Sequence, residues 1–420
     1  MRSGSALMLL AWTILGLAGI ALSSTGPADE SLALVGGTIY SNPTDAPIRD
    51  GVVLIRGDKI VAVGDRALLA STQPMQVLDC RGLALTAGFW NSHVHFFERK
   101  WANAAQVPAA ELARQLEDFT TRWGFTTVFD LSSLWENTRK LRDRIQSGEV
   151  AGPRILSTGE ALVAKGTLPP EIVMTLAGGM KVPLPEIATP DEAVAATRKR
   201  IGEDVDAIKI HNGRTQMPPP ATAAFPEDAI RAAVAEAHKA GKPVFVHPNT
   251  SAEILAAVRA GVDVVGHTTP FAGPWDEAVL AAMKEHKVAL TPTLTIWKYF
   301  MRHDRVSTQD KIVETETAQL RAWVQRGGTV LFGTDLGAID PDPSEEYALM
   351  AQSGMTFPQI LASLTTAPAE RFGDSDRLGR IAPGMQADVV VLQGDPGQDL
   401  RALTAVQYTI RAGKIIYRAQ

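Results

Sequence analysis

Side chains that can bind a metal ion stand at the ends of several apolar runs in this sequence. His93 and His95 end the first run, and because residues i and i+2 of a strand point to the same face, both imidazoles can reach one ion. A lone His-x-His pair is more often structural, but other runs end in the same way. The further residues of this kind are Lys209, His211, His247, His267 and Asp335. Their shared position predicts one polar site and argues against scattered core histidines.

The runs that carry these residues alternate with helical stretches, which is typical of a parallel sheet built from βαβ units. The expected strands are 88–96, 126–131, 154–159, 207–211, 243–247, 262–267, 288–293 and 329–335, and the expected helices are 109–123, 190–203, 226–240, 251–260, 275–286 and 314–326. Eight β/α units over roughly 290 residues predict an α/β fold with a closed (β/α)8 TIM barrel, whose chemistry lies at the C-terminal ends of its strands. A doubly wound open sheet is the alternative, and the sequence lacks the usual glycine fingerprint of that fold.

Both ends of the chain have a different texture, with short alternating β runs separated by turn residues. Neither end has enough strands for a stable core of its own, so we expect the two ends to pair into one small β-sandwich. The predicted organisation is an N-terminal segment of the β-sandwich at residues 30–86, the barrel at 87–376 and a C-terminal segment of the β-sandwich at 377–420.

Charge and cysteine content exclude several classes of protein. There are 41 Lys and Arg residues against 46 Asp and Glu residues, a net charge of −5 without a basic block, so nucleic acid is not an expected partner. The single cysteine, Cys80, excludes an intrachain disulfide framework and a thiolate-rich zinc site. A bound metal would therefore need histidine and carboxylate-type ligands. The expected partner is a small-molecule substrate, and a homo-oligomer stays open.

The N-terminal segment has the features of an export signal: Arg2 precedes an apolar run from Ala6 to Leu22, and small and polar residues follow. We expect residues 1–24 to be a signal peptide. An uncleaved membrane anchor is the alternative, because the run approaches the ~20 residues that span a bilayer. No later stretch is long and apolar enough to cross a membrane. The expected location is the periplasm or the cell exterior, with no membrane contact beyond this segment.

Six motifs together resemble the metal-dependent amidohydrolase superfamily, within the group similar to imidazolonepropionase and prolidase-like enzymes. They are GFWNSHVH at 88–95, IKI at 208–210, VHP at 246–248, GHT at 266–268, GTD at 333–335 and GRIAPGMQAD at 379–388. The resemblance covers nearly the whole chain after the N-terminal segment. It is specific for the superfamily and not for a substrate.

The resemblance implies a pair of divalent metals, the first held by His93, His95 and Asp335 and the second by His247 and His267. Lys209 would bridge them after carboxylation by carbon dioxide, since an ammonium has no lone pair and would repel the ions. The alternative is that Lys209 pairs with a carboxylate or binds substrate, which leaves one metal per chain. Nitrogen and oxygen ligands without sulfur favour zinc, while manganese, iron, cobalt and nickel stay open.

The chemistry that follows is hydrolysis, because a divalent metal lowers the pKa of bound water toward neutrality. Asp335 is the expected proton shuttle, which takes the water proton and returns it to the leaving nitrogen. His211 lies two residues after Lys209 on the same face, where it could donate a hydrogen bond to the scissile carbonyl. A structural role at the barrel rim is the alternative for His211. The expected activity is cleavage of an amide, peptide-like or cyclic amide C–N bond.

Loops after the strands are expected to select the substrate, since loops carry specificity. Arg214 follows the fourth strand, and Trp297 and Tyr299 follow the seventh. An aromatic wall with a cationic group would suit an amide with an apolar part and a far carboxylate. The alternatives are that the aromatic residues only pack the loops, and that Asp340 and Asp342 contact a basic substrate.

Two departures from the prolidase pattern weaken the case for dipeptidase specificity while keeping the metal site. Gly266 and Thr268 flank His267 where relatives often have Glu-His-Gly, and Asn212-Gly213 stands where they often have small residues. The runner-up activity is a lactonase or esterase with the same metal site, since the fold does not fix the scissile bond. Deamination of a purine-like ring and a non-catalytic binding protein are less favoured.

Two further carboxylates stand at strand ends and could be extra ligands or substrate contacts. They are Asp130 after the second expected strand and Glu160 after the third. Both are left outside the expected ligand set.

Overall fold

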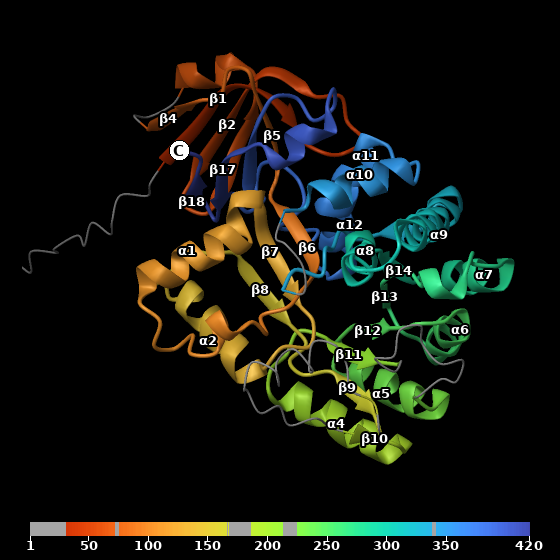
Figure 1. Cartoon of the computed structure of the whole chain (residues 1–420). Coiled ribbons are helices and arrows are strands. Elements are labelled where there is room, and N and C mark those ends of the chain that lie inside the picture. The colour runs from red at the N-terminus through yellow and green to blue at the C-terminus, as the bar shows by residue number, and fades with distance from the viewer. Residues whose placement is uncertain (1–30, 72–74, 166, 168–185, 213–224, 338–341) are drawn as a thin grey trace, which may run out of the picture.

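A computed structural model of the chain describes residues 31–71, 75–165, 167, 186–212, 225–337 and 342–420 (Figure 1). The expected signal peptide at 1–24, Arg214 and Asp340 lie outside these ranges and stay predictions. Within the described ranges, no helix is long and apolar enough to cross a membrane.

Strands from both ends of the chain form one eight-stranded sheet, seen at the top of Figure 1. Its order is β18-β17-β16-β5-β1-β2-β3, and β4 pairs with β1. The two ends meet where β5 pairs antiparallel with β16, with Leu85 opposite Val391. The bounds are β1 Ser31–Tyr40, β2 Ile48–Arg56, β3 Lys59–Gly64, β4 Gln76–Asp79, β5 Leu83–Ala87, β16 Val389–Gln393, β17 Val406–Arg411 and β18 Lys414–Arg418.

This sheet has an apolar core that includes Leu34, Val53, Leu85 and Val391. Cys80 is buried in the same core, and burial raises the pKa of its thiol to about 11. Such a thiol stays protonated and unreactive at neutral pH. Cys80 is therefore a buried residue of the sheet core.

The middle of the chain forms two sheets in which every pair of neighbouring strands is parallel. The three-stranded sheet has the order β6-β7-β8, with bounds β6 Phe89–Val94, β7 Phe125–Asp130 and β8 Arg154–Ser157. The seven-stranded sheet has the order β10-β9-β11-β12-β13-β14-β15. Its bounds are β9 Leu162–Ala164, β10 Glu186–Ile187, β11 Ile208–His211, β12 Val244–His247, β13 Val264–Gly266, β14 Ala289–Thr291 and β15 Thr329–Val330.

Backbone hydrogen bonds connect the two parallel sheets on both sides. On one side, the N–H of Asp206 before β11 donates to the carbonyl of Ser157 at the end of β8, at 2.8 Å. On the other side, the N–H of Ser92 in β6 donates to Phe332 at 2.7 Å, and the N–H of Asp335 donates to His93 at 2.9 Å. The segment after β15 therefore lies directly beside β6.

Helices surround the parallel strands, with α4 to α7 and α9 along the outer rim of Figure 1. Thr189 begins α4 with a capping box to Glu192, and Thr250 caps α6 three residues after β12 ends. The helix bounds are α1 Ala109–Phe119, α2 Trp135–Gln146, α4 Pro190–Gly202, α5 Glu227–Lys239, α6 Ser251–Ala260, α7 Glu277–Glu285, α8 Leu294–Phe300, α9 Val306–Gln325, α10 Ser344–Gln352, α11 Phe357–Leu364 and α12 Thr366–Arg371. Short 3-10 turns occur at Arg66–Ser71, Arg99–Trp101, Thr121–Trp123, Pro270–Ala272 and Leu400–Thr404.

Several elements differ from the sequence prediction. The eighth run was expected to be a strand over 329–335, but β15 ends at Val330 because the segment beyond it turns toward β6. The aromatic residues after the seventh strand were expected in a loop, and they lie in α8. Strands β9 and β10 were not predicted, since three and two residues are too short to show a period.

Candidate metal centre

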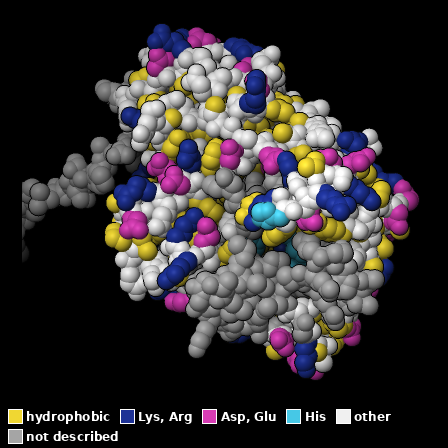
Figure 2. Space-filling model, in the orientation of Figure 1, with side chains coloured by type: hydrophobic (Ala, Val, Ile, Leu, Met, Phe, Trp, Pro, Cys, Tyr) yellow, Lys and Arg dark blue, Asp and Glu magenta, His cyan; other side chains and the backbone are white. Residues whose placement is uncertain are grey.

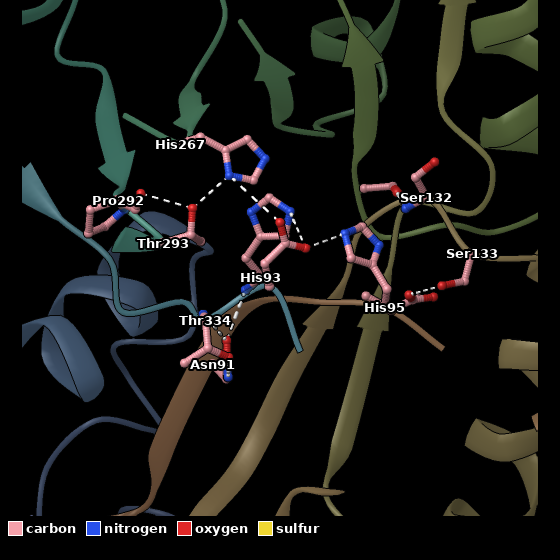
Figure 3. Close-up of polar contacts among 12 residues, drawn as sticks. Asn91, His93, His95, Ser132, Ser133, His267, Pro292, Thr293 and Thr334 are labelled. Atoms are coloured by element: carbon pink, nitrogen blue, oxygen red, sulfur yellow. Dashed lines mark hydrogen bonds and ion pairs between the residues drawn. The ribbon is translucent and has the colours of Figure 1, made fainter. Parts of the chain in front are cut away.

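The predicted ligands lie together at the C-terminal ends of the parallel strands. His93 belongs to β6 and His95 directly follows it, while His247 ends β12 and His267 directly follows β13. Figure 3 shows that His93, His95 and His267 point toward one another. Five of the eight histidines of the chain lie in this region, and they are His93, His95, His211, His247 and His267.

Asp335 lies at the centre of this cluster. Its Oδ1 atom is 2.7 Å from Nε2 of His95 and 3.7 Å from Nε2 of His93. Its Oδ2 atom is 3.8 Å from Nδ1 of His267. The cluster continues to His247, whose ring centroid is 4.5 Å from that of His267. Figure 2 shows histidine side chains at the floor of a hollow near the centre of this face.

The backbone at two of these residues is strained. His267 has φ +83° and Asp335 has φ +61°, both in the left-handed region that residues with a Cβ rarely adopt. Such conformations cost on the order of 1–3 kcal/mol each and persist where the surrounding structure enforces them, often at functional sites. The strain therefore marks the end of β13 and the segment after β15 as positions where side-chain direction matters.

Asn91 connects the two segments that carry His93 and Asp335. Its Nδ2 donates to Oγ1 of Thr334 at 2.8 Å. Its Oδ1 accepts the backbone N–H of His93 at 3.2 Å and that of Thr334 at 3.3 Å. The side chain is fully buried. Asn91 thus fixes the relative position of a candidate ligand on β6 and the segment that ends in Asp335.

Glycine allows close packing behind the cluster. A Cβ atom on Gly333 would overlap Cγ2 of Thr291 and lie 2.9 Å from Cβ of His93. A Cβ atom on Gly266 would lie 3.3 Å from both Cε1 of His93 and Nζ of Lys209. The contacts around Gly266 therefore place the buried Lys209 amine near His93, as the sequence predicts.

Removal from water lowers the pKa values of three imidazoles of the cluster. The pKa of His93 lies well below its ordinary value, first because the ring is buried and second because Lys209 is near. The pKa of His267 is lowered by burial and then by His93, and the pKa of His247 by burial and then by His211. These rings are therefore neutral at pH 7. A neutral imidazole offers the lone pair that a metal ligand needs.

The side chains present fit a divalent metal. His93 is fully buried, and neither of its ring nitrogens has a hydrogen-bond partner within the described part of the chain. Burying polar atoms without partners is costly, and a coordinated ion would satisfy one of them. Ligand atoms of His93, His267 and Asp335 all lie within 4.8 Å of one another. These three residues form a candidate metal site.

His211 lies at the rim of the cluster. Its ring stacks on that of His247, with centroids 4.1 Å apart and an interplanar angle of 15°. This position beside a candidate ligand is compatible with the expected contact to a substrate carbonyl. Its role stays a prediction.

The two aromatic residues expected to bind substrate lie in different surroundings. Trp297 is buried in α8, with its ring centroid 5.8 Å from that of His267 and 6.4 Å from that of His247. The ring of Tyr299 instead lies 4.0 Å from the guanidinium of Arg302 and lines a separate hollow of about 230 Å³ with that residue. Trp297 therefore borders the cluster, whereas no described contact joins Tyr299 to it.

Asp130 and Glu160 have other partners in the structure. The Asp130 carboxylate accepts hydrogen bonds from Thr138 and Ser157, both at 2.9 Å, and from Ser133. Glu160 forms a buried ion pair with Arg200. Asp130 thus links the end of β7 to Ser133, to α2 and to the end of β8, and neither carboxylate is among the three residues of the candidate metal site.

Thr293 is a neighbour of the cluster that the sequence analysis missed. Its Oγ1 lies 2.6 Å from Nδ1 of His267, although 26 residues separate them in the chain. Asn91 was included in one of the six motifs, but no role was assigned to it. A threonine after an apolar run carries no distinctive signal, so only the folded arrangement shows the contact.

Parallel β/α units that carry a buried cluster of histidine and aspartate side chains at their strand ends are typical of hydrolases with a metal centre. Residues 84–416 match the amidohydrolase family, and the chain belongs to this family. The expected resemblance to the imidazolonepropionase-like and prolidase-like group is confirmed. An imidazolonepropionase from Porphyromonas gingivalis is 26% identical over 42% of this chain and 45% of its own, and prolidase structures are described next.

Named relatives are hydrolases with similar chains. Ochratoxinase from Aspergillus niger is 26% identical, over 94% of this chain and 88% of its own. The crystal structure of a Xaa-Pro dipeptidase with bound methionine has a TM-score of 0.79 and 25% identity, covering 93% of this chain and 100% of the other. A prolidase structure with N-methylphosphonate-L-proline has a TM-score of 0.76 and 27% identity over the same shares. The chain is a hydrolase that acts on C–N bonds.

Proposed function

We propose that this protein hydrolyses an amide or peptide-like bond at a divalent metal centre built on the ends of its parallel strands. The observation that carries the proposal is the group of buried imidazoles that converges on the Asp335 carboxylate, among which burial keeps His93 and His267 neutral. The proposed ligands are His93, His95, Lys209, His247, His267 and Asp335. In this proposal the two parallel sheets form one closed (β/α)8 barrel, and the strands from the chain ends form the β-sandwich beside it.

Zinc is the proposed metal, because all the proposed ligand atoms are nitrogen or oxygen. Two ions bind per chain if Lys209 is carboxylated, and one binds otherwise. The nearness of the Lys209 amine to His93, across Gly266, supports the bridged pair. Its positive charge also lowers the pKa of His93, so neutralising the amine by carboxylation would remove an unfavourable neighbour of the metal.

When bound, the metal supplies acidity, lowering the pKa of a water molecule toward neutrality. Asp335 is the proposed proton shuttle: its carboxylate accepts the water proton and returns it to the leaving nitrogen. Nε2 of His95 lies 2.7 Å from Oδ1 of Asp335, so these two proposed ligands are direct neighbours. His211 donates a hydrogen bond to the scissile carbonyl oxygen as negative charge develops there.

Dipeptides and N-acyl amino acids are the proposed substrate class. Two solved relatives with 25% and 27% identity carry the names of a Xaa-Pro dipeptidase and a prolidase, which supports this class. The buried ring of Trp297 beside His267 offers an apolar wall for the acyl or amine side chain. Arg214 is the proposed partner of the substrate carboxylate.

Hydrolysis assays of the zinc-loaded protein test this proposal. Ala-Pro, Phe-Ala and N-acetyl-phenylalanine are the amide probes, with γ-butyrolactone and phenyl acetate as ester probes, and products are followed by liquid chromatography. The proposal predicts turnover of at least one amide probe and loss of that turnover in Asp335→Asn. Asp118→Asn, at an exposed position on α1, is the matched control and should keep full activity. Turnover of the esters alone would contradict the proposal in favour of a lactonase or esterase.

A further inference from the structure

Thr293 lies between β14 and α8 in an unusual backbone conformation. Its φ of +46° is in the left-handed region, which a β-branched residue adopts only under constraint. In this conformation Oγ1 lies 2.6 Å from Nδ1 of His267 and 2.8 Å from the carbonyl oxygen of Pro292 (Figure 3). The strained turn therefore brings a hydroxyl group against a proposed metal ligand.

A buried carboxylate holds this turn in place. Glu346 on α10 accepts the backbone N–H groups of Leu294 at 2.9 Å and Thr295 at 3.0 Å, and the Thr295 hydroxyl at 3.1 Å. These are the first two residues of α8, directly after Thr293. Because Glu346 is fully buried, its hydrogen bonds do not compete with water. Glu346 thus fixes the helix start and, through it, the position of the Thr293 hydroxyl.

The surroundings of Nδ1 of His267 determine which ring nitrogen carries the proton. The Thr293 hydroxyl donates its hydrogen to Pro292, so toward His267 it presents a lone pair. Oδ2 of Asp335 lies 3.8 Å from Nδ1, beyond hydrogen-bond distance. Because the hydroxyl hydrogen points to Pro292, the 2.6 Å contact is a hydrogen bond only with Nδ1 as the donor, so Nδ1 carries the hydrogen. A neutral imidazole that carries its hydrogen on Nδ1 has its lone pair on Nε2.

We propose that Thr293 is a positioning residue that holds His267 as the tautomer protonated on Nδ1 and thereby reserves Nε2 for the divalent metal. Hydrogen bonds from the second nitrogen of a ligand histidine orient the ring and increase its basicity, and their loss typically weakens metal binding 10–100-fold. The tautomer is a property of the metal-free chain. Only the component of the inference that concerns metal binding rests on the proposed function.

The first test is the tautomer of His267 in the full-length, metal-free protein. Two-bond 15N–1H spectra of protein labelled at histidine distinguish the two neutral tautomers, and the signals that disappear in His267→Gln assign the residue. The expected pattern is that of a ring protonated on Nδ1. A ring protonated on Nε2 would overturn the proposal, whatever the enzyme hydrolyses.

The second test compares zinc affinity in three variants by competition with a fluorescent chelator. Thr293→Val keeps the β-branched shape and removes the hydroxyl, and we expect its zinc affinity to fall about tenfold. Thr293→Ser restores the hydroxyl and should bind within about twofold of the wild type. Thr291→Val is the matched control, because the Thr291 hydroxyl is buried without a hydrogen-bond partner among the described residues. Unchanged affinity in Thr293→Val, or an equal loss in Thr291→Val, would overturn the proposal.

The two tests separate this inference from the proposed function. If Thr293→Val does not fold, Thr293→Ser decides: retention of the Nδ1-protonated ring and of zinc affinity supports the proposal, and loss of either overturns it. If the tautomer and affinities are as expected but no amide is hydrolysed, the proposed function fails and the role of Thr293 stands. If amides are hydrolysed while His267 is protonated on Nε2, the role of Thr293 fails and the function stands.

Discussion

Replacing Gly333 with alanine tests how closely the chain packs beside the candidate metal centre. Gly333 belongs to the segment that leaves β15 and lies along β6. An added Cβ would overlap Cγ2 of Thr291, lie 2.9 Å from Cβ of His93 and 3.2 Å from the backbone nitrogen of His93. The nitrogen and Cβ of His93 are fixed by its backbone, and Cγ2 of Thr291 belongs to a short, buried, β-branched side chain, so these neighbours cannot swing aside as the end of a long side chain would.

The cost of this substitution follows from the overlap. Overpacking a filled core by one methyl group costs about 1–3 kcal/mol in the free energy of unfolding, and we expect Gly333→Ala to lie near the upper end at about 3 kcal/mol. The φ of Gly333 is not positive, so the cost is steric and not conformational. Relief of the overlap would displace His93, so the variant should also retain less zinc.

Denaturant unfolding followed by tryptophan fluorescence measures the first effect, and zinc content after dialysis measures the second. Gly202→Ala is the control: Gly202 ends α4, its φ is not positive, and an added Cβ would meet no atom within 4 Å. This control should be as stable as the wild type or more stable by up to about 1 kcal/mol. Equal stability and full zinc content in Gly333→Ala would refute the packing argument.

Three further predictions concern individual side chains. Asp335→Asn should lower kcat about a hundredfold or more with an unchanged circular dichroism spectrum, and retained turnover would exclude Asp335 as the shuttle. His93→Ala should lower the zinc content per chain measured by elemental analysis, and an unchanged content would remove His93 from the ligands. Burial raises the pKa of Glu346 from 4.5 to about 7, so the folded state holds this proton more tightly and the free energy of unfolding falls as pH rises from 4.5 through 7. The loss corresponds to about 3 kcal/mol between pH 4.5 and pH 8, and unfolding at both pH values should show a smaller loss in Glu346→Gln.

The positions of the cluster residues could be predicted from the sequence because each follows an apolar run that forms a buried parallel strand. Lys209 and His211 lie in β11, and His247 ends β12, within the runs expected for them. Parallel strands present their C-terminal ends at one edge, so residues far apart in the chain were expected to meet. The short distances from Asp335 to His93 and His95 agree with that expectation.

The strained backbone conformations in the cluster could not be predicted from the sequence. His267, Thr293 and Asp335 adopt left-handed backbone conformations, which their residue types disfavour and only tertiary contacts enforce. The contact between Thr293 and His267 depends on that conformation and on Glu346, 53 residues further along the chain. Local sequence patterns carry no information on such distant hydrogen bonds.

The helix that carries Trp297 was also missed, because its seven residues are too few to show a helical period. The same limit applies to β9 and β10. By contrast, the pairing of both chain ends in one sheet follows from their alternating pattern, since β5 and β16 each need a neighbour to satisfy their backbone groups.

The most direct test of the central claim is a titration of the metal-free protein with zinc, in which bound zinc and the rate of amide hydrolysis are measured in the same samples. We predict no activity without zinc, a rise in rate with bound zinc and saturation at two equivalents per chain. Saturation at one equivalent would replace the bridged pair by a single metal and give Lys209 another role. Full activity of the metal-free protein would contradict the account that the cluster around Asp335 is a catalytic metal centre.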